Sequence, residues 1–138
     1  MTFPINEMQM LKYVYEFGVD AATGAVSLRQ DPNPIAEGLV VMGIQVRFVA
    51  AFTGATALTL GNTADPDGYL ADFFAFNALD AVVNSSAVAG DLIWDDTNDH
   101  PIHYRIGSAA NVQDLVLTIT GTATAGQLEV YLFCTNHI

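Results

Sequence analysis

Apolar and polar residues alternate over several short stretches of the chain. The clearest stretch runs from Val40 to Phe48, where every second residue is apolar and Gly43, Gln45 and Arg47 lie between them. This period of two is typical of a strand that buries one face, because successive side chains of a strand point to opposite sides. The same alternation recurs later in the chain at Leu115, Leu117 and Ile119, and again at Leu128, Val130, Leu132 and Cys134.

Short runs of this kind, rich in Val, Ile, Leu, Thr and aromatic residues, predict many strands and no long helix. Residues that favour turns separate the runs, which favours antiparallel connections. We expect a hairpin connection at residues 20–24, a break at 31–34, a tight turn at Thr53-Gly54 and a link between the last two strands at 122–126. The expected strands are residues 12–19, 25–29, 39–52, 55–60, 91–94, 103–106, 115–120 and 127–134.

One stretch departs from the strand pattern. Asp67 is placed to cap a short helix that begins at Gly68 or Tyr69 and ends at Asn77, with its apolar side chains on one face. Such a helix is too short to form a core and is expected to close one end of the domain. The elements together predict an all-β fold, a jelly-roll-like antiparallel β-sandwich of about eight strands with one short helix.

The chain begins with an apolar segment that precedes the first expected strand. We expect residues 1–11 to form an extended N-terminal arm and residues 12–138 to form a single β-sandwich domain. An apolar arm either folds back on its own domain or packs on a neighbouring protein, and the sequence leaves both possibilities open. The predicted partner contacts are the large apolar residues of this arm, Phe3, Ile5, Met8 and Met10.

Composition and charge exclude several classes of protein. Of the 138 residues, 51% are apolar and 14% are charged, which suits one folded domain without a disulfide or metal and excludes intrinsic disorder. No stretch approaches the ~20 apolar residues of a membrane-spanning helix. The N-terminus lacks the features of a signal peptide, so we expect the protein to stay where it is synthesised. The net charge of −11, with only four basic residues, predicts repulsion from nucleic acids and from anionic membranes.

Two acidic segments carry the types of residue that bind metals. Residues 95–103 hold three aspartates and two histidines, which are ligands for Ca²⁺, Mn²⁺ or Zn²⁺. Their spacing fits no known metal loop, so we interpret this segment as a solvated acidic loop. Residues 65–68 resemble the start of a calcium loop, but a type I turn explains all four of them. We therefore predict no metal.

The sequence contains no catalytic signature. The candidate nucleophiles Ser85, Ser86 and Ser108 lack the Gly-x-Ser-x-Gly setting of an activated serine. The single cysteine, Cys134, lies in an apolar run and is expected to be a buried, inert thiol. Trp94 and the five tyrosines could form a platform for sugars, although aromatic residues in strands more often pack in the core. We predict that the protein is not an enzyme and binds no cofactor.

The order and spacing of several strand–turn–strand segments resemble those of a group of small virion proteins of tailed bacteriophages. Each segment is weakly specific, but together they extend over about residues 13–133. The segments are 15–20 with 24–28, 34–41, 55–61 followed by Tyr69-Leu70, 115–120, 124–127 and 128–132. The chain departs from the pattern in residues 95–103 and 134–138, which leaves its place in the virion open.

This resemblance implies a head decoration (cement) protein with a β-sandwich fold. Such a protein would be synthesised in the host cytoplasm, bind the major capsid protein on the outer surface of the head as a homotrimer, and stabilise the shell by bridging capsomers. The alternatives are a head fibre or spike base, a receptor- or carbohydrate-binding virion module, a tail or connector protein, and a hydrolase with a β-sandwich fold.

Overall fold

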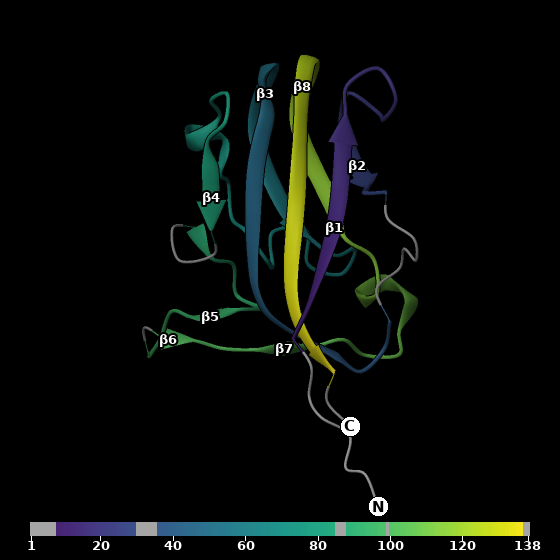
Figure 1. Cartoon of the computed structure of the whole chain (residues 1–138), viewed down its shortest axis with the longest axis vertical. Coiled ribbons are helices and arrows are strands. Elements are labelled where there is room, and N and C mark those ends of the chain that lie inside the picture. Colours follow the sequence, from purple (N-terminus) through teal and green to yellow (C-terminus); the bar gives the residue numbers. More distant parts are fainter. Residues whose placement is uncertain (1–7, 30–35, 85–87, 99, 137–138) are drawn as a thin grey trace, which may run out of the picture.

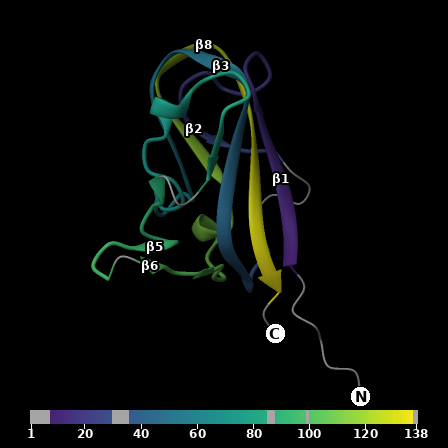
Figure 2. The same cartoon turned by 60° about the vertical axis from the view of Figure 1, so that its left-hand side comes forward.

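Two long strands that pair with each other over their whole length form the centre of the fold. The computed structural model describes residues 8–29, 36–84, 88–98 and 100–136. Strand β3 (Leu39–Gly61) is antiparallel to β8 (Val116–Asn136), with a register that runs from Leu39 opposite Asn136 to Gly61 opposite Val116. Both strands bend near their middle, so the sheet folds over and its two halves face each other as the layers of a sandwich (Figures 1 and 2).

Shorter strands extend each half of this folded sheet. In the larger layer, β1 (Met8–Glu16) pairs with the second half of β8, while β4 (Val82–Asn84) and β7 (Tyr104–Arg105) pair with the first half of β3. In the smaller layer, β2 (Gly24–Ser27) pairs with the first half of β8. A separate hairpin joins β5 (Trp94–Asp95) to β6 (His100–Pro101). The all-β, antiparallel sandwich is confirmed; the jelly-roll connectivity stays a prediction.

Two glycines allow the paired strands to bend. Gly54 has a φ of +84°, and a Cβ atom at this position would lie 2.2 Å from the carbonyl oxygen of Thr122. Gly121 also has a φ of +84°, and its Cβ would lie 2.8 Å from the carbonyl oxygen of Gly54. Only glycine combines this backbone conformation with so close an approach. The backbones of the two paired strands therefore lie too close together at the bend for a side chain at either glycine.

The bend corrects two of the expected boundaries. Thr53-Gly54 does not end a strand, and residues 122–126 do not link two strands, because β3 and β8 both continue through these positions. The register between the two strands shifts at several points between Phe48 and Ala57. Irregularities of this type let a strand bend sharply without leaving its partner. The residues that suggested turns therefore bend two continuous strands.

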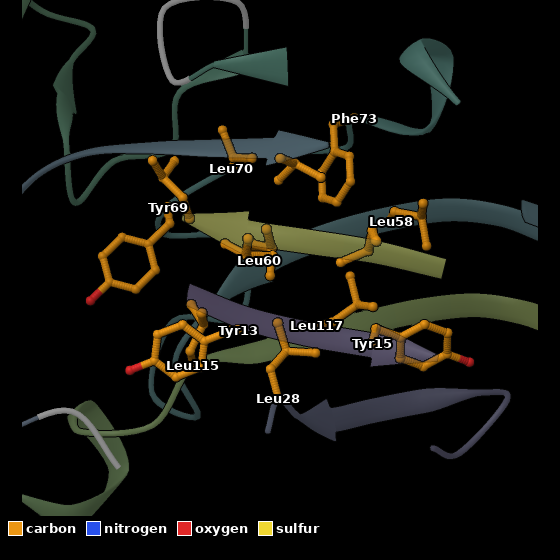
Figure 3. Close-up of a cluster of buried hydrophobic side chains, with 14 of the residues drawn as sticks. Tyr13, Tyr15, Leu28, Leu58, Leu60, Tyr69, Leu70, Phe73, Leu115 and Leu117 are labelled. Atoms are coloured by element: carbon orange, nitrogen blue, oxygen red, sulfur yellow. The ribbon is translucent and has the colours of Figure 1, made fainter. Parts of the chain in front are cut away.

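The core lies between the two layers (Figure 3). Tyr13 and Tyr15 of β1 enter it from the larger layer, and Leu58, Leu60 and Leu117 enter it from the smaller layer. An aromatic group closes the core beneath the bend, where the rings of Tyr15 and Phe52 are stacked with their centroids 5.3 Å apart. The alternation predicted for β3 is confirmed for Ile44, Val46 and Phe48, which are buried, while Gln45 and Arg47 face away. It is wrong for Val40 and Met42, because the register shifts between Val41 and Gly43 and Val41 is buried in their place.

The helix expected between Gly68 or Tyr69 and Asn77 is wrong. This segment contains only a 3₁₀ turn, η1 (Phe74–Phe76), and a second one, η2 (Ala110–Val112), precedes β8. Leu70 instead donates its backbone N–H to the Leu60 carbonyl, 2.9 Å away, and a carboxylate oxygen of Asp72 accepts the N–H of Leu58 at 3.1 Å. The edge of β3 offers unpaired backbone groups, and satisfying them stabilises an extended segment over a helix.

Three further expectations need correction. Residues 20–24 do not close a simple hairpin, because β1 and β2 pair with opposite halves of β8 and the link crosses from one layer to the other. The strands expected at 91–94 and 103–106 shrink to the two-residue strands β5 and β7, and β4 and β6 were not expected. Strands of two or three residues are too short for a pattern with a period of two to be detected.

Strand β1 begins earlier than expected. Met8 and Met10, which the sequence assigns to the arm, lie opposite Thr135 and Phe133 in the sheet. The reason is that β8 continues to Asn136 and so supplies a pairing partner for these residues. Phe3 and Ile5 lie outside the described residues.

Candidate interaction surface

The larger layer presents a broad sheet surface away from the core. We define the outer face by the side chains that β1, β3, β4 and β8 direct to this side. Its members lie in rows across the strands; one row runs from Val82 through Arg47 and Glu129 to Val14. Besides this row, the outer face comprises Met10, Lys12, Val40, Met42, Gln45, Tyr131 and Phe133.

One part of the outer face is apolar. Met10 is 59% exposed and lies opposite Phe133, which is itself only half-buried. Tyr131 and Met42, also half-buried, continue this apolar region. The solvated face of an antiparallel sheet normally carries polar residues, and a contiguous exposed apolar region marks a surface that another molecule covers. The composition of the outer face therefore suits a protein contact.

An ionic network crosses the neighbouring rows of the outer face. The Lys12 ammonium lies 3.0 Å from one carboxylate oxygen of Glu129, and the Arg47 guanidinium lies 3.2 Å from the other. Arg47 also reaches Asp80, at 3.2 Å. The Tyr131 hydroxyl donates a hydrogen bond to Glu129. Two of the four basic residues of the chain are therefore paired on this face.

The network shifts the ionisation of its members. Hydrogen bonds from the Tyr131 hydroxyl and the Lys12 ammonium lower the pKa of Glu129. The same contacts raise the pKa of Lys12 and that of Tyr131, because each donates to a carboxylate. All three shifts favour the arrangement with an ionised Glu129 and a protonated Lys12. The outer face thus has fixed charges of both signs beside its apolar region.

The structure brings together one predicted contact residue and several that were not predicted. Met10 lies in the outer face, and Met8 begins the same strand. Tyr131 and Phe133 were not predicted as contacts. A signal for them exists in the sequence, because residues 127–134 carry aromatic side chains on the face opposite the buried one. Whether such a strand is buried on both sides depends on what covers it.

Within the acidic segment, β5 and β6 pair as a hairpin that projects from the body of the sandwich (Figure 1). A carboxylate oxygen of Asp95 accepts the backbone N–H of Thr97 at 2.9 Å, which fixes the turn. Beside the hairpin is an open depression of about 450 Å³ lined by Trp94, Ile102 and acidic residues. Tyr104 does not line it; its ring packs against that of Tyr69, with the centroids 6.0 Å apart.

The remaining candidate sites, residues 65–68 and Cys134, have ordinary structural roles. Residues 65–68 form a turn in which the Gly68 N–H donates to the Asp65 carbonyl at 3.0 Å. Burial and the neighbouring Asp67 raise the pKa of Asp65. Within the described ranges, no three His, Cys, Asp or Glu side chains are grouped so that they could hold a metal ion. Cys134 is buried, as predicted, and burial raises the pKa of its thiol to about 11.

Comparison with solved structures shows that the fold is shared with a phage protein. A chain of the cyanophage Pam1 capsid asymmetric unit superposes with a TM-score of 0.64 at 13% identity, covering 99% of this chain and 93% of that one. A chain of the acidic stable capsid structure of the Helicobacter pylori bacteriophage KHP30 gives a TM-score of 0.45 at 12% identity, and the match covers 95% of this chain and 90% of that one. No protein-family model and no curated protein matches the sequence.

A further observation concerns membranes. The described residues contain no helix with the length and apolar character needed to span a bilayer.

Proposed function

We propose that this protein is a structural component of a bacteriophage virion and that it acts by binding the capsid shell. The observation that carries the proposal is the match with a chain of the cyanophage Pam1 capsid asymmetric unit. The match covers 99% of this chain and 93% of the other, so it concerns the whole fold of both proteins. The segments that resemble small virion proteins of tailed bacteriophages support the same role.

More specifically, we propose a decoration (cement) protein on the outer surface of the head. The net charge of −11 opposes contact with packaged DNA and favours a position on the outside of the shell. The major capsid protein is the proposed partner. Met10, Phe133 and Tyr131 on the outer face offer the apolar contact, and the ionic network of Lys12, Arg47 and Glu129 offers fixed charges of both signs to polar groups of the shell.

A homotrimer fits this function. Three weak contacts made together act as one strong attachment, because binding of the first subunit raises the effective concentration of the other two at their sites. A trimer at a junction between capsomers would bridge them and so resist their separation. We propose that residues 1–7, which include Phe3 and Ile5, add to the contact with the shell.

Binding to capsids that lack the protein tests this role. The variant Met10→Asp places a charge in the apolar region, which should weaken binding about 10-fold or more, since 1.4 kcal/mol of lost affinity corresponds to a factor of ten. The matched control is Ser27→Asp, which adds the same charge at an exposed position in the smaller layer. Occupancy is measured by sedimentation of particles after mixing with purified protein.

A deletion separates the contribution of the N-terminal segment. It should stop at residue 7, because removing residues 1–11 would also remove part of β1, which begins at Met8. The deletion should lower occupancy while circular dichroism stays unchanged. Equal occupancy for wild type, Met10→Asp and the deletion would refute the proposed contact, and failure of the wild type to bind would refute the function.

The second candidate is a receptor- or carbohydrate-binding virion module. It rests on Trp94, which lines the depression beside the β5–β6 hairpin together with acidic side chains. Indole rings and carboxylates are suited to stack on and hydrogen-bond to sugars. A glycan array in which the wild type binds and Trp94→Ala does not would favour this module over a decoration protein.

A further inference from the structure

The end of the sandwich at which β3 and β8 bend has an unusual surface. We define the bent end as residues 50–57 and 120–127, with Phe17, Val19, Phe76 and Leu79 beside them (top of Figure 1). No residue in 50–57 or 120–127 is charged; the side chains there are Ala, Thr, Gly, Phe and Gln. In a chain whose net charge is −11, two uncharged segments side by side are a distinct feature; the charged residues Glu16, Asp20 and Asp80 lie in the flanking segments.

Hydrogen bonds hold the flanking segments against the bend. The Phe17 N–H donates to the Gly126 carbonyl at 2.9 Å. On the other side, the Asn77 side chain accepts the Phe52 N–H at 2.6 Å and donates to the Phe52 carbonyl at 2.7 Å. These contacts fix the loop after β1 and the loop after η1 on either side of the bend (Figures 1 and 2).

The flanking segments expose large apolar side chains at this end. Phe17 is 40% exposed, Val19 62%, Phe76 41% and Leu79 67%. They are four of the six large hydrophobic residues that are exposed in the described part of the chain. The bent end also carries exposed hydroxyls, and those of Thr53 and Thr124 are hydrogen-bonded to each other across β3 and β8 at 2.7 Å.

Charge is distributed unevenly along the molecule. Near the bent end, Arg29 pairs with Asp20 at 3.0 Å and Arg47 pairs with Asp80 at 3.2 Å. The opposite end, where both ends of β3 lie, carries the acidic loops. Their acidic residues are Asp65, Asp67, Asp91, Asp95, Asp96 and Asp114. Two copies that approach through their acidic ends therefore repel each other strongly, whereas the repulsion between two bent ends is weaker, because Asp20 and Asp80 are each paired with an arginine.

We propose that the bent end binds a second copy of this chain, and that the subunits of the proposed oligomer meet there. Threonine hydroxyls both donate and accept hydrogen bonds, so identical surfaces can pair. The exposed apolar side chains would be covered, and residues 50–57 and 120–127 themselves carry no charge that would lose its water. The outer face is less suited to a second copy, because the partly exposed ion pairs of Lys12 and Arg47 with Glu129 and Asp80 would lose their water on burial.

This inference rests on the proposed homo-oligomer, but its test requires no capsid. The mass of the purified full chain is measured by light scattering and sedimentation equilibrium at physiological salt, for wild type, Leu79→Asp and Met10→Asp. Leu79→Asp places a charge at the bent end, and Met10→Asp places the same charge at a residue of similar exposure on the outer face. We expect an oligomer for wild type and Met10→Asp, and subunit affinity lowered about 10-fold or more for Leu79→Asp.

A cross-linking variant gives a second measurement. Thr122→Cys adds one exposed thiol at the bent end, while the native Cys134 is buried. A short bis-maleimide should then join subunits covalently. A monomeric wild type, an unchanged mass for Leu79→Asp, or the absence of cross-links overturns the inference. If the wild type is monomeric and Leu79→Asp only lowers capsid occupancy, the shell covers the bent end and the inference is wrong while the proposed function stands.

Discussion

Replacing Tyr69 with phenylalanine is expected to stabilise the protein, although it removes a polar group from the core. Tyr69 is fully buried, and its hydroxyl has no hydrogen-bond partner among the described residues. Its backbone is firmly held, since its N–H donates to Leu60 at 3.0 Å and its carbonyl accepts from Gly90 at 3.0 Å. Phenylalanine keeps these bonds and the edge-on ring contact with Tyr104, so only the hydroxyl is lost.

The magnitude follows from the environment of that hydroxyl. A buried polar group without a partner costs about 1–3 kcal/mol. The oxygen also makes van der Waals contacts, and losing them costs a fraction of this, because each atom pair contributes only ~0.1–0.2 kcal/mol. We therefore expect Tyr69→Phe to raise the free energy of unfolding by about 1 kcal/mol, or the melting temperature by about 3 °C for a domain of this size.

Tyr15 provides the matched control. It is as deeply buried as Tyr69, and its ring also contacts another aromatic ring, but its hydroxyl donates to the Ala21 carbonyl at 2.8 Å. Tyr15→Phe should therefore lower the free energy of unfolding by about 1 kcal/mol. Both variants are compared with the wild type by urea unfolding at equal protein concentration. If both substitutions destabilise the protein equally, the Tyr69 hydroxyl has a hydrogen-bond partner in solution and the reasoning is refuted.

Two further predictions concern the bend and the response to alkali. Gly54→Ala should lower the free energy of unfolding by about 3 kcal/mol or more, because its Cβ would lie 2.2 Å from the Thr122 carbonyl oxygen. The control Gly18→Ala, where φ is +92° but the space is open, should cost only ~1–2 kcal/mol in thermal unfolding. Equal losses for the two variants would contradict this account. Burial raises the pKa of Tyr13 and Tyr69 above the ordinary value for tyrosine, about 10. The unfolded chain therefore loses these protons first, and the stability that the two groups contribute falls as the pH rises above about 10. The double variant Tyr13→Phe with Tyr69→Phe should lose less stability than the wild type between about pH 9 and 11 in urea titrations, and an identical loss would contradict the shifts.

The pattern of side chains along the chain determined which residues face the core. The alternation around Ile44, Val46 and Phe48 predicted their burial, because side chains alternate in direction along a regular strand. The same alternation failed at Val40 and Met42, on the other side of the register shift between Val41 and Gly43. The all-β class follows from the same local property. Met10 was predicted as a partner contact from its size and apolar character, and the structure places it exposed on the outer face; its contact with a partner stays a prediction. The distribution of charge over the fold could not be predicted, because ion pairs such as that of Arg47 with Glu129 join residues that are far apart in the sequence.

Only the tertiary structure decided where strands end and which strands pair. Thr53-Gly54 has the composition of a turn, but whether such residues reverse the chain or bend a continuous strand depends on a partner that bends with them, and that partner is residues 120–127 of β8. The position of Met10 opposite Phe133 likewise depends on a register between distant segments. Local sequence sets the conformations that a residue can adopt, and long-range pairing selects among them, because backbone hydrogen bonds to a distant strand outweigh small local preferences.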